Sequence, residues 1–176
     1  MSERAYKVLG RYQLLVAVAR GGMGQVWLAR LQGARGFSKV VAIKTLLPNQ
    51  EDLARLEGML AEEARIASLI QHANVVRTME LGEHEGMLYL VMEWVEGDSL
   101  ALLQRAASRN SAPLPMTVAM RIVAQMCAGL HAAHELADRN GKALNVVHRD
   151  VSPQNVILSG SGEGNLINFG IAKAVD

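Results

Sequence analysis

A lysine and a glutamate on otherwise apolar surfaces are the first residues whose types and spacing could do chemistry. Lys44 ends the run Val41-Ala42-Ile43-Lys44, and strand alternation places Ala42 and Lys44 on one face of a segment that is otherwise expected to be buried. A buried charge without a partner is costly, so this lysine requires an anion nearby. The alternative is a lysine that extends from a strand end into water.

Glu63 could supply that anion. In a helix expected over residues 51–70, Glu63 lies seven residues from both Leu56 and Ile70. At about 100° per residue it falls within about 20° of each, so it interrupts the apolar face. We therefore expect an ion pair between Lys44 and Glu63. A carboxylate exposed to water at the edge of a lobe is the alternative.

A glycine-rich segment precedes the lysine. Gly21, Gly22 and Gly24 lie between strands expected at 12–18 and 25–30. Without a Cβ atom in the way, backbone N–H groups can approach phosphate oxygens. An ordinary hairpin explains such a cluster equally well, so the segment predicts a phosphate site only together with other residues.

The most specific segment lies near the C-terminal end. It contains His148-Arg149-Asp150, then Asn155, then Asn168-Phe169-Gly170. Magnesium prefers hard oxygen ligands and is usually held by one or two carboxylates as well as substrate phosphates. This segment resembles the catalytic loop and metal-binding tripeptide of protein kinases, which implies that Asn155 and the residue at position 168 would hold magnesium. Both offer amide oxygens only, so a metal site here would be weakened. Asn168 as a simple turn residue is the alternative.

Taken in order, these segments resemble the eukaryotic-like Ser/Thr protein kinases of bacteria, from about Tyr12 to Val175. The resemblance implies that the glycine loop covers the phosphates of ATP and that Lys44, paired with Glu63, contacts them. It implies that Asp150 accepts the proton of the substrate hydroxyl. It also implies that Asn155 and the residue at position 168 hold magnesium. Lys44, Glu63 and Asp150 are therefore the candidate catalytic residues.

The resemblance also implies an adenine site. Residues 93–97 resemble the kinase hinge, so the backbone of Glu93 and Val95 would hydrogen-bond the base, and Met92 would be the gatekeeper. Four apolar residues would enclose the ring: Val18, Val26, Ala42 and Ile157. Apolar residues at these positions are equally what a protein core needs, so the indication comes from their order along the chain.

Three departures from the family pattern lead to two hypotheses. Ser152 stands where the family usually has lysine, Asn168 replaces the metal-binding aspartate, and the 176 residues contain no Ala-Pro-Glu motif. The first hypothesis is a nucleotide-binding pseudokinase that acts as a regulator or scaffold, with ATP bound and magnesium weak or lost. The alternative is an active ATP-dependent Ser/Thr protein kinase, truncated or inactivated at Asn168.

The expected fold class is α+β. Five antiparallel strands, at 12–18, 25–30, 40–46, 75–81 and 87–93, and the helix over 51–70 would form a complete N-lobe within residues 1–95. Helices at 98–108 and 116–137 would form a truncated C-lobe within 96–176, with short strands at 146–147, 156–158 and 166–167.

The composition of the chain bears on its binding partners and its cellular location. Lys and Arg number 18 against 17 for Asp and Glu, so the net charge of +1 gives no argument for nucleic-acid or membrane binding. The single cysteine, Cys127, permits no intramolecular disulfide and favours a cytoplasmic location. The charged N-terminal residues do not resemble a signal peptide, and no run of about 20 apolar residues is expected to span a membrane.

The helix over 116–137 carries an apolar stripe formed by Met116, Met120, Val123, Met126 and Leu130. A short C-lobe would leave part of this stripe uncovered, and large exposed apolar patches usually mark interfaces. We therefore expect a homo-oligomer or a protein partner that uses the surface around 116–137 and the C-terminal tail.

Overall fold

The structure is a computed structural model that describes residues 7–21, 24–47, 52–169 and 173–174. It divides into two compact units, one formed by residues up to Ala64 together with Thr78–Trp94, and one formed by Arg65–Arg77 together with the chain from Val95 onward. The sequence division after residue 95 differs from this one in the segment 65–77, which packs with the second unit.

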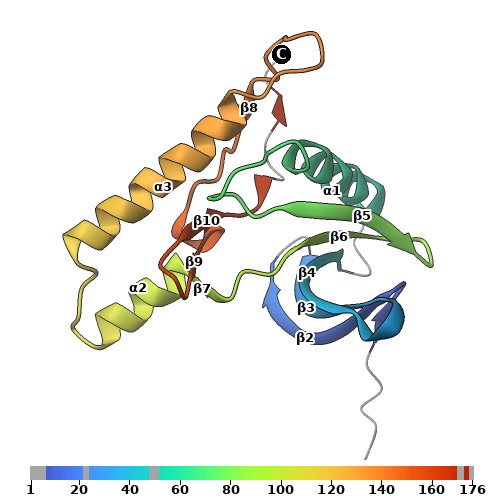
Figure 1. Cartoon of the computed structure of the whole chain (residues 1–176), viewed down its shortest axis with the longest axis horizontal. Coiled ribbons are helices and arrows are strands. Elements are labelled where there is room, and N and C mark those ends of the chain that lie inside the picture. Colours follow the sequence, from blue (N-terminus) through green and yellow to red (C-terminus); the bar gives the residue numbers. More distant parts are fainter. Residues whose placement is uncertain (1–6, 22–23, 48–51, 170–172, 175–176) are drawn as a thin grey trace, which may run out of the picture. The chain divides into compact units, whose positions relative to one another are not determined.

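The first unit contains a curled antiparallel sheet (Figure 1). Its strands are β1 (Val8–Leu9), β2 (Tyr12–Arg20), β3 (Gly24–Gln32), β4 (Ser38–Leu46), β5 (Thr78–His84) and β6 (Met87–Glu93), in the order β1-β2-β3-β4-β6-β5. The expectation of five strands was therefore one short. The two-residue β1, which pairs with β2, is too brief to leave a periodic pattern in the sequence.

One face of this sheet carries the hydrophobic core of the first unit. Val41 and Ile43 of β4 and Val91 of β6 are fully buried and pack with Tyr12 and Tyr89. Helix α1 (Leu53–Ala67) forms within the expected range 51–70, because its helix-forming residues repeat their apolar positions every three to four residues. Leu56 and Leu60 of this helix are buried.

Strand β5 lies three residues later than expected. The run Val75–Leu81 was predicted as a strand, but the strand begins at Thr78. Val75 and Val76 are buried, and Val76 donates its backbone N–H to the carbonyl oxygen of Leu166 at 2.9 Å. These two apolar residues therefore pair with the second unit instead of the sheet, and periodicity alone does not distinguish the two uses.

The second unit combines helices with short strands. Its elements are β7 (Gly97–Ser99), α2 (Leu100–Arg109), α3 (Met116–His134), β8 (Val146–Val147), the 3-10 turn η2 (Pro153–Asn155), β9 (Val156–Ser159), β10 (Gly164–Leu166) and β11 (Lys173–Ala174). They form a three-stranded sheet in the order β10-β9-β7 and a β11-β8 pair. Ser99 begins α2 by accepting a hydrogen bond from the N–H of Leu102.

Helix α3 has a buried face and an exposed apolar face. Ile122, Met126, Gly129 and Ala133 are buried, and a Cβ atom on Gly129 would lie 2.9 Å from the carbonyl oxygen of Asn74, so only glycine permits this approach. The predicted stripe divides between these two faces, so part of it is uncovered, as expected. Met126 lies in the core, whereas three residues of the stripe point to solvent: Met116, Met120 and Val123, which are 74%, 64% and 60% exposed.

By length and composition, α3 is also a candidate membrane span, with a mean hydropathy of 1.2. The expectation that no segment qualifies was therefore wrong for 116–134. The indication is weak, since the core helix of a water-soluble domain passes the same test. Its buried residues Ile122, Met126 and Ala133 belong to the hydrophobic core of the second unit.

Candidate functional site

The expected ion pair between Lys44 and Glu63 is present. The Nζ atom of Lys44 lies 2.6 Å from a carboxylate oxygen of Glu63, and their side chains are only 14% and 6% exposed. Strand β4 supplies the lysine and helix α1 the glutamate, both within the first unit. An anionic partner offsets the cost of burying the ammonium group, so the lysine is held in place and directed by the pair.

The sheet register places other predicted residues on the same face as Lys44. In antiparallel pairs, residues directly opposite each other share a face. Val26 lies opposite Lys44, and Met92 lies opposite Ala42, which is two residues before Lys44 on β4. Ala42 and Met92 are buried, and Val26 is half-buried. Val18 lies at an irregularity between β2 and β3 and is 45% exposed.

The glycines between β2 and β3 differ in whether the surrounding structure leaves room for a Cβ atom. A Cβ atom on Gly24 would overlap the backbone carbonyl of Thr45, so this glycine is required by packing. A Cβ on Gly21 would meet no atom of the described residues within 4 Å. The N–H of Gly21 donates to the carbonyl of Gly24 at 2.9 Å, which closes the hairpin. Gly22 lies outside the described residues, so its predicted phosphate contact stays a prediction.

The hinge residues lie where β6 ends. Glu93 is the last residue of β6, opposite Val41 on β4. Val95 begins the second unit outside any strand, and among the described residues its backbone N–H and C=O have no hydrogen-bond partner. Such groups can bind a ligand or water. Ile157, in β9 of the second unit, is half-buried and lies opposite Asn165 and Ser99.

His148 anchors the loop that carries Asp150. The residue is 1% exposed, and its ring meets the ring of Phe169 edge-on, with 4.5 Å between centroids. Its Nε2 atom lies 3.0 Å from the carbonyl of Ile167, and its Nδ1 accepts the backbone N–H of Asp150 at 3.3 Å. These contacts assign the proton to Nε2, so the histidine ties the two segments of the site together.

Asp150, Asn155 and Asn168 form a continuous hydrogen-bonded chain. The amide nitrogen of Asn155 donates to the Oδ2 atom of Asp150 at 2.7 Å. The amide nitrogen of Asn168 donates to the Oδ1 atom of Asn155 at 2.8 Å. Asn168 has φ of 62°, a left-handed conformation that Asn adopts more easily than most residues. The functional and the turn-residue interpretations of Asn168 are therefore both compatible with its geometry.

These residues fit a magnesium ion poorly. The Oδ1 atom of Asn155, one expected metal ligand, already accepts a hydrogen bond from Asn168. Within the described part of the chain, no buried side-chain nitrogen or oxygen lacks a hydrogen-bond partner. Among the same residues, no group of three or more His, Cys, Asp and Glu side chains is placed to hold a metal. The amide pair supplies no carboxylate, which magnesium usually requires.

Comparison with known proteins identifies the family. Residues 12–176 match the family model described as the protein kinase domain. The chain belongs to the protein kinase family. It is 41% identical over 165 residues to "Tyrosine-protein kinase MasK" of Myxococcus xanthus, covering 94% of this chain and 26% of that protein. It is 36% identical over 165 residues to "Serine/threonine-protein kinase PknD" of Mycobacterium tuberculosis, covering 94% of this chain and 23% of that protein.

A solved structure agrees on the kinase fold. The structure titled "PpkA-294 apo form" superposes with a TM-score of 0.76 at 19% identity, and the match covers 96% of this chain and 62% of that one. This confirms the expected protein-kinase-like fold. The chain spans about a quarter of the length of the curated kinases that it matches.

Sequence reasoning missed a cluster and a cavity. In the first unit, Tyr12 donates its hydroxyl to a carboxylate oxygen of Glu80 at 2.7 Å, and Arg11 pairs with the same oxygen. In the second unit, a cavity lies between α2 and η2. The repeat of Arg105 and Arg109 at i and i+4 could have indicated a basic face on this helix, but not the cavity beside it.

Proposed function

We propose that this kinase-family chain is a nucleotide-binding module with impaired phosphoryl transfer, which acts in the cytoplasm as a regulator or scaffold. The observation that carries the proposal is the Asp150–Asn155–Asn168 chain, in which two amides bond to each other where the family holds a metal. Kinase catalysis is almost entirely positioning and charge neutralisation, so loss of a metal carboxylate removes a large part of it.

Nucleotide binding depends on residues that are intact. Lys44, fixed by Glu63, is placed to attract phosphate oxygens, and Ala42 and Met92 offer apolar surface to a base. The backbone of Val95 has free donor and acceptor groups among the described residues. We therefore infer that ATP or ADP binds mainly through these groups and that the contribution of magnesium is small.

An active protein kinase is the second candidate. It is favoured by the Lys44–Glu63 pair and by Asp150, whose Oδ2 atom is oriented by Asn155. No described residue donates a hydrogen bond to the other carboxylate oxygen of Asp150, which could accept a hydroxyl proton. The relatives' names include both serine/threonine and tyrosine kinases. An assay must therefore offer both kinds of hydroxyl.

Titration calorimetry with ADP and ATP, with and without magnesium, tests the proposal. We expect binding in both conditions, with affinities that differ by less than about threefold, because amide oxygens hold the ion weakly. If magnesium tightened nucleotide binding by about a hundredfold, another group would have to hold the ion, and our assignment of Asn168 would be wrong. Phosphorylation of serine or tyrosine peptides that is abolished by Asp150→Ala would favour the active kinase.

A further inference from the structure

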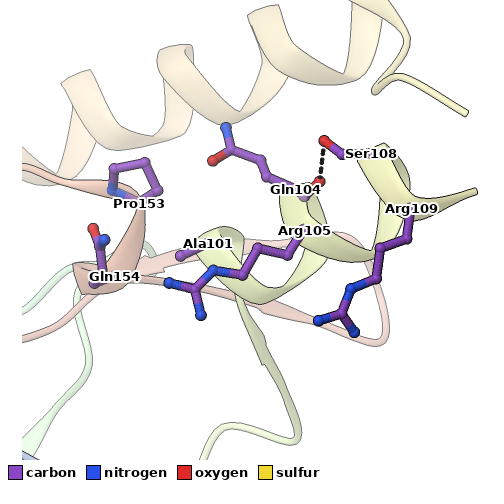
Figure 2. Close-up of a pocket in the computed structure, with 7 residues that line it drawn as sticks. All are labelled: Ala101, Gln104, Arg105, Ser108, Arg109, Pro153 and Gln154. Carbon is purple, nitrogen blue, oxygen red and sulfur yellow. Dashed lines mark hydrogen bonds between the residues drawn. The ribbon is translucent and has the colours of Figure 1, made fainter. Parts of the chain in front are cut away.

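The cavity in the second unit has a volume of about 350 Å³ and lies between helix α2 and the turn η2. We call it the α2 pocket. It is lined by Ala101, Gln104, Arg105, Ser108, Arg109, Pro153 and Gln154 (Figure 2). Two of these residues are cationic and none is acidic, so the pocket has the charge expected of an anion site.

The two arginines share one side of α2. Arg105 and Arg109 are four residues apart, one helical turn, and both guanidinium groups point to the same side of the helix (Figure 2). Arg105 extends toward Gln154. Within the described residues, neither arginine makes an ion pair. Guanidinium groups bind carboxylate and phosphate groups through paired hydrogen bonds, so both are available for an anionic ligand.

The pocket lies close to Asp150 along the chain. Pro153 and Gln154 directly precede Asn155, whose amide nitrogen is 2.7 Å from the carboxylate of Asp150. Gln154 is four positions after Asp150, which limits the distance between their Cα atoms to about 13 Å at about 3.3 Å per residue. An extended peptide covers that distance within about four residues.

We propose that the α2 pocket binds an anionic group of a polypeptide, a carboxylate or a phosphoryl group, located a few residues from the hydroxyl that faces Asp150. The inference rests on the proposed function for the position of that hydroxyl. The affinity for the anion rests on the pocket itself: on its positive charge, its volume, and two arginines that form no ion pair with the described residues. A substrate or pseudosubstrate with acidic or phosphorylated residues near its serine, threonine or tyrosine is therefore preferred over a neutral or basic one.

Fluorescence anisotropy with labelled peptides tests this without nucleotide. The peptides contain one serine flanked at two to four residues by glutamate, phosphoserine, glutamine or lysine. We expect the glutamate and phosphoserine peptides to bind at least about fivefold more tightly than the glutamine peptide, since two exposed ion pairs contribute modestly. The tighter of the two identifies which anion the pocket prefers. The preference weakens as salt is raised, because the arginines are exposed.

Variants of the two arginines test whether the α2 pocket causes the preference for acidic peptides. Arg105→Gln with Arg109→Gln should abolish the preference, and Arg105→Glu with Arg109→Glu should reverse it toward the lysine peptide. Arg139→Gln, at an exposed position in the loop after α3, is the single-charge control, to be compared with Arg105→Gln alone. The proposal would be overturned if all four peptides bound equally tightly. It would also be overturned if Arg105→Gln and Arg139→Gln reduced the preference for the acidic peptides by the same amount.

ADP titration of the same variants separates this inference from the proposed function. Unchanged ADP affinity in Arg105→Gln/Arg109→Gln, with peptide preference lost, supports both. If ADP does not bind but the acidic peptides are still preferred, the nucleotide proposal fails and the α2 pocket stands. If ADP binds and the peptides are not discriminated, the α2 pocket is refuted alone.

Discussion

At the scale of single residues, the side chain at position 168 determines how strongly the site can bind a magnesium ion. An aspartate differs from Asn168 by one atom and also tolerates the left-handed conformation at φ of 62°. As a carboxylate it cannot donate the hydrogen bond that now reaches Asn155. The amide oxygen of Asn155 would then be free to turn toward an ion.

We therefore predict that Asn168→Asp makes nucleotide binding magnesium-dependent, with about a tenfold tightening when the ion is present. Calorimetry with and without magnesium measures the change. Asn140→Asp, in an exposed loop of the second unit, adds the same charge elsewhere and serves as the control. An equal response of both variants to magnesium would show that bulk charge, not a ligand at position 168, is responsible.

The Lys44–Glu63 pair gives a prediction about stability. Lys44→Ala leaves Glu63, whose side chain is 6% exposed, without a cation, and we expect unfolding free energy to fall by about 3 kcal/mol. Lys44→Met with Glu63→Leu should cost much less, because no buried charge remains. Urea denaturation measures both. Arg55→Ala, from an exposed pair with Asp52, is the control and should change stability by less than about 0.5 kcal/mol.

At the scale of elements, Tyr12 and Glu80 link β2 to β5. Burial, followed by the hydrogen bond to Glu80, raises the pKa of Tyr12 above its ordinary value of 10.0. For Glu80, burial raises the pKa, but the hydrogen bonds from Tyr12 and Arg11 outweigh it and lower the pKa overall. Each group therefore favours the protonation state that keeps the hydrogen bond between these strands.

The raised pKa of Tyr12 predicts a loss of stability in alkali. Because the folded protein holds this proton more tightly than the unfolded chain, the contribution is complete below pH 10.0 and is lost as the pH rises through the folded-state pKa. We expect Tyr12→Phe to flatten the decline in unfolding free energy above pH 10.0, measured by urea denaturation. Burial also raises the pKa of Tyr89. Part of the decline in unfolding free energy therefore remains in Tyr12→Phe, and only the double variant Tyr12→Phe/Tyr89→Phe removes it. A decline identical in all three proteins would contradict the assignment.

The same elements show how far sequence predicts structure. Strand β6 begins and ends where expected, and the partner of Lys44 follows from two charges on apolar faces. Val75 and Val76 were misassigned, because an apolar pair at a strand end does not reveal which of two cores will bury it. The α2 pocket was missed, since no sequence pattern shows that η2 lies beside α2.

At the scale of the whole molecule, the fold is shared by the whole kinase family, whereas activity is a property of individual side chains. The kinase family model covers residues 12–176, whereas the chain spans about a quarter of its curated relatives. The order of the motifs was enough to predict the fold. In our proposal, phosphoryl transfer depends on the side chains at positions 152 and 168, which a fold shared with active enzymes does not determine.

The exposed face of α3 leads to a prediction about association. Met116, Met120 and Val123 form an apolar surface that the described residues leave in contact with solvent. In a two-fold dimer the same face meets itself, so a second copy can cover these side chains without any other partner. We propose that the chain associates with itself through this face of α3. The C-terminal tail, also expected to contribute, lies in part outside the described residues.

Met120→Glu should weaken this association by at least about tenfold, because it places a charge in an apolar contact. Val118→Glu, on another side of the same helix and 41% exposed, is the matched control and should leave the association intact. Light scattering across micromolar concentrations measures both. A monomeric wild-type protein would contradict the proposal. If instead the wild-type protein floats with neutral lipid vesicles and Met120→Glu does not, the apolar face of α3 binds a membrane surface rather than a second copy of the chain.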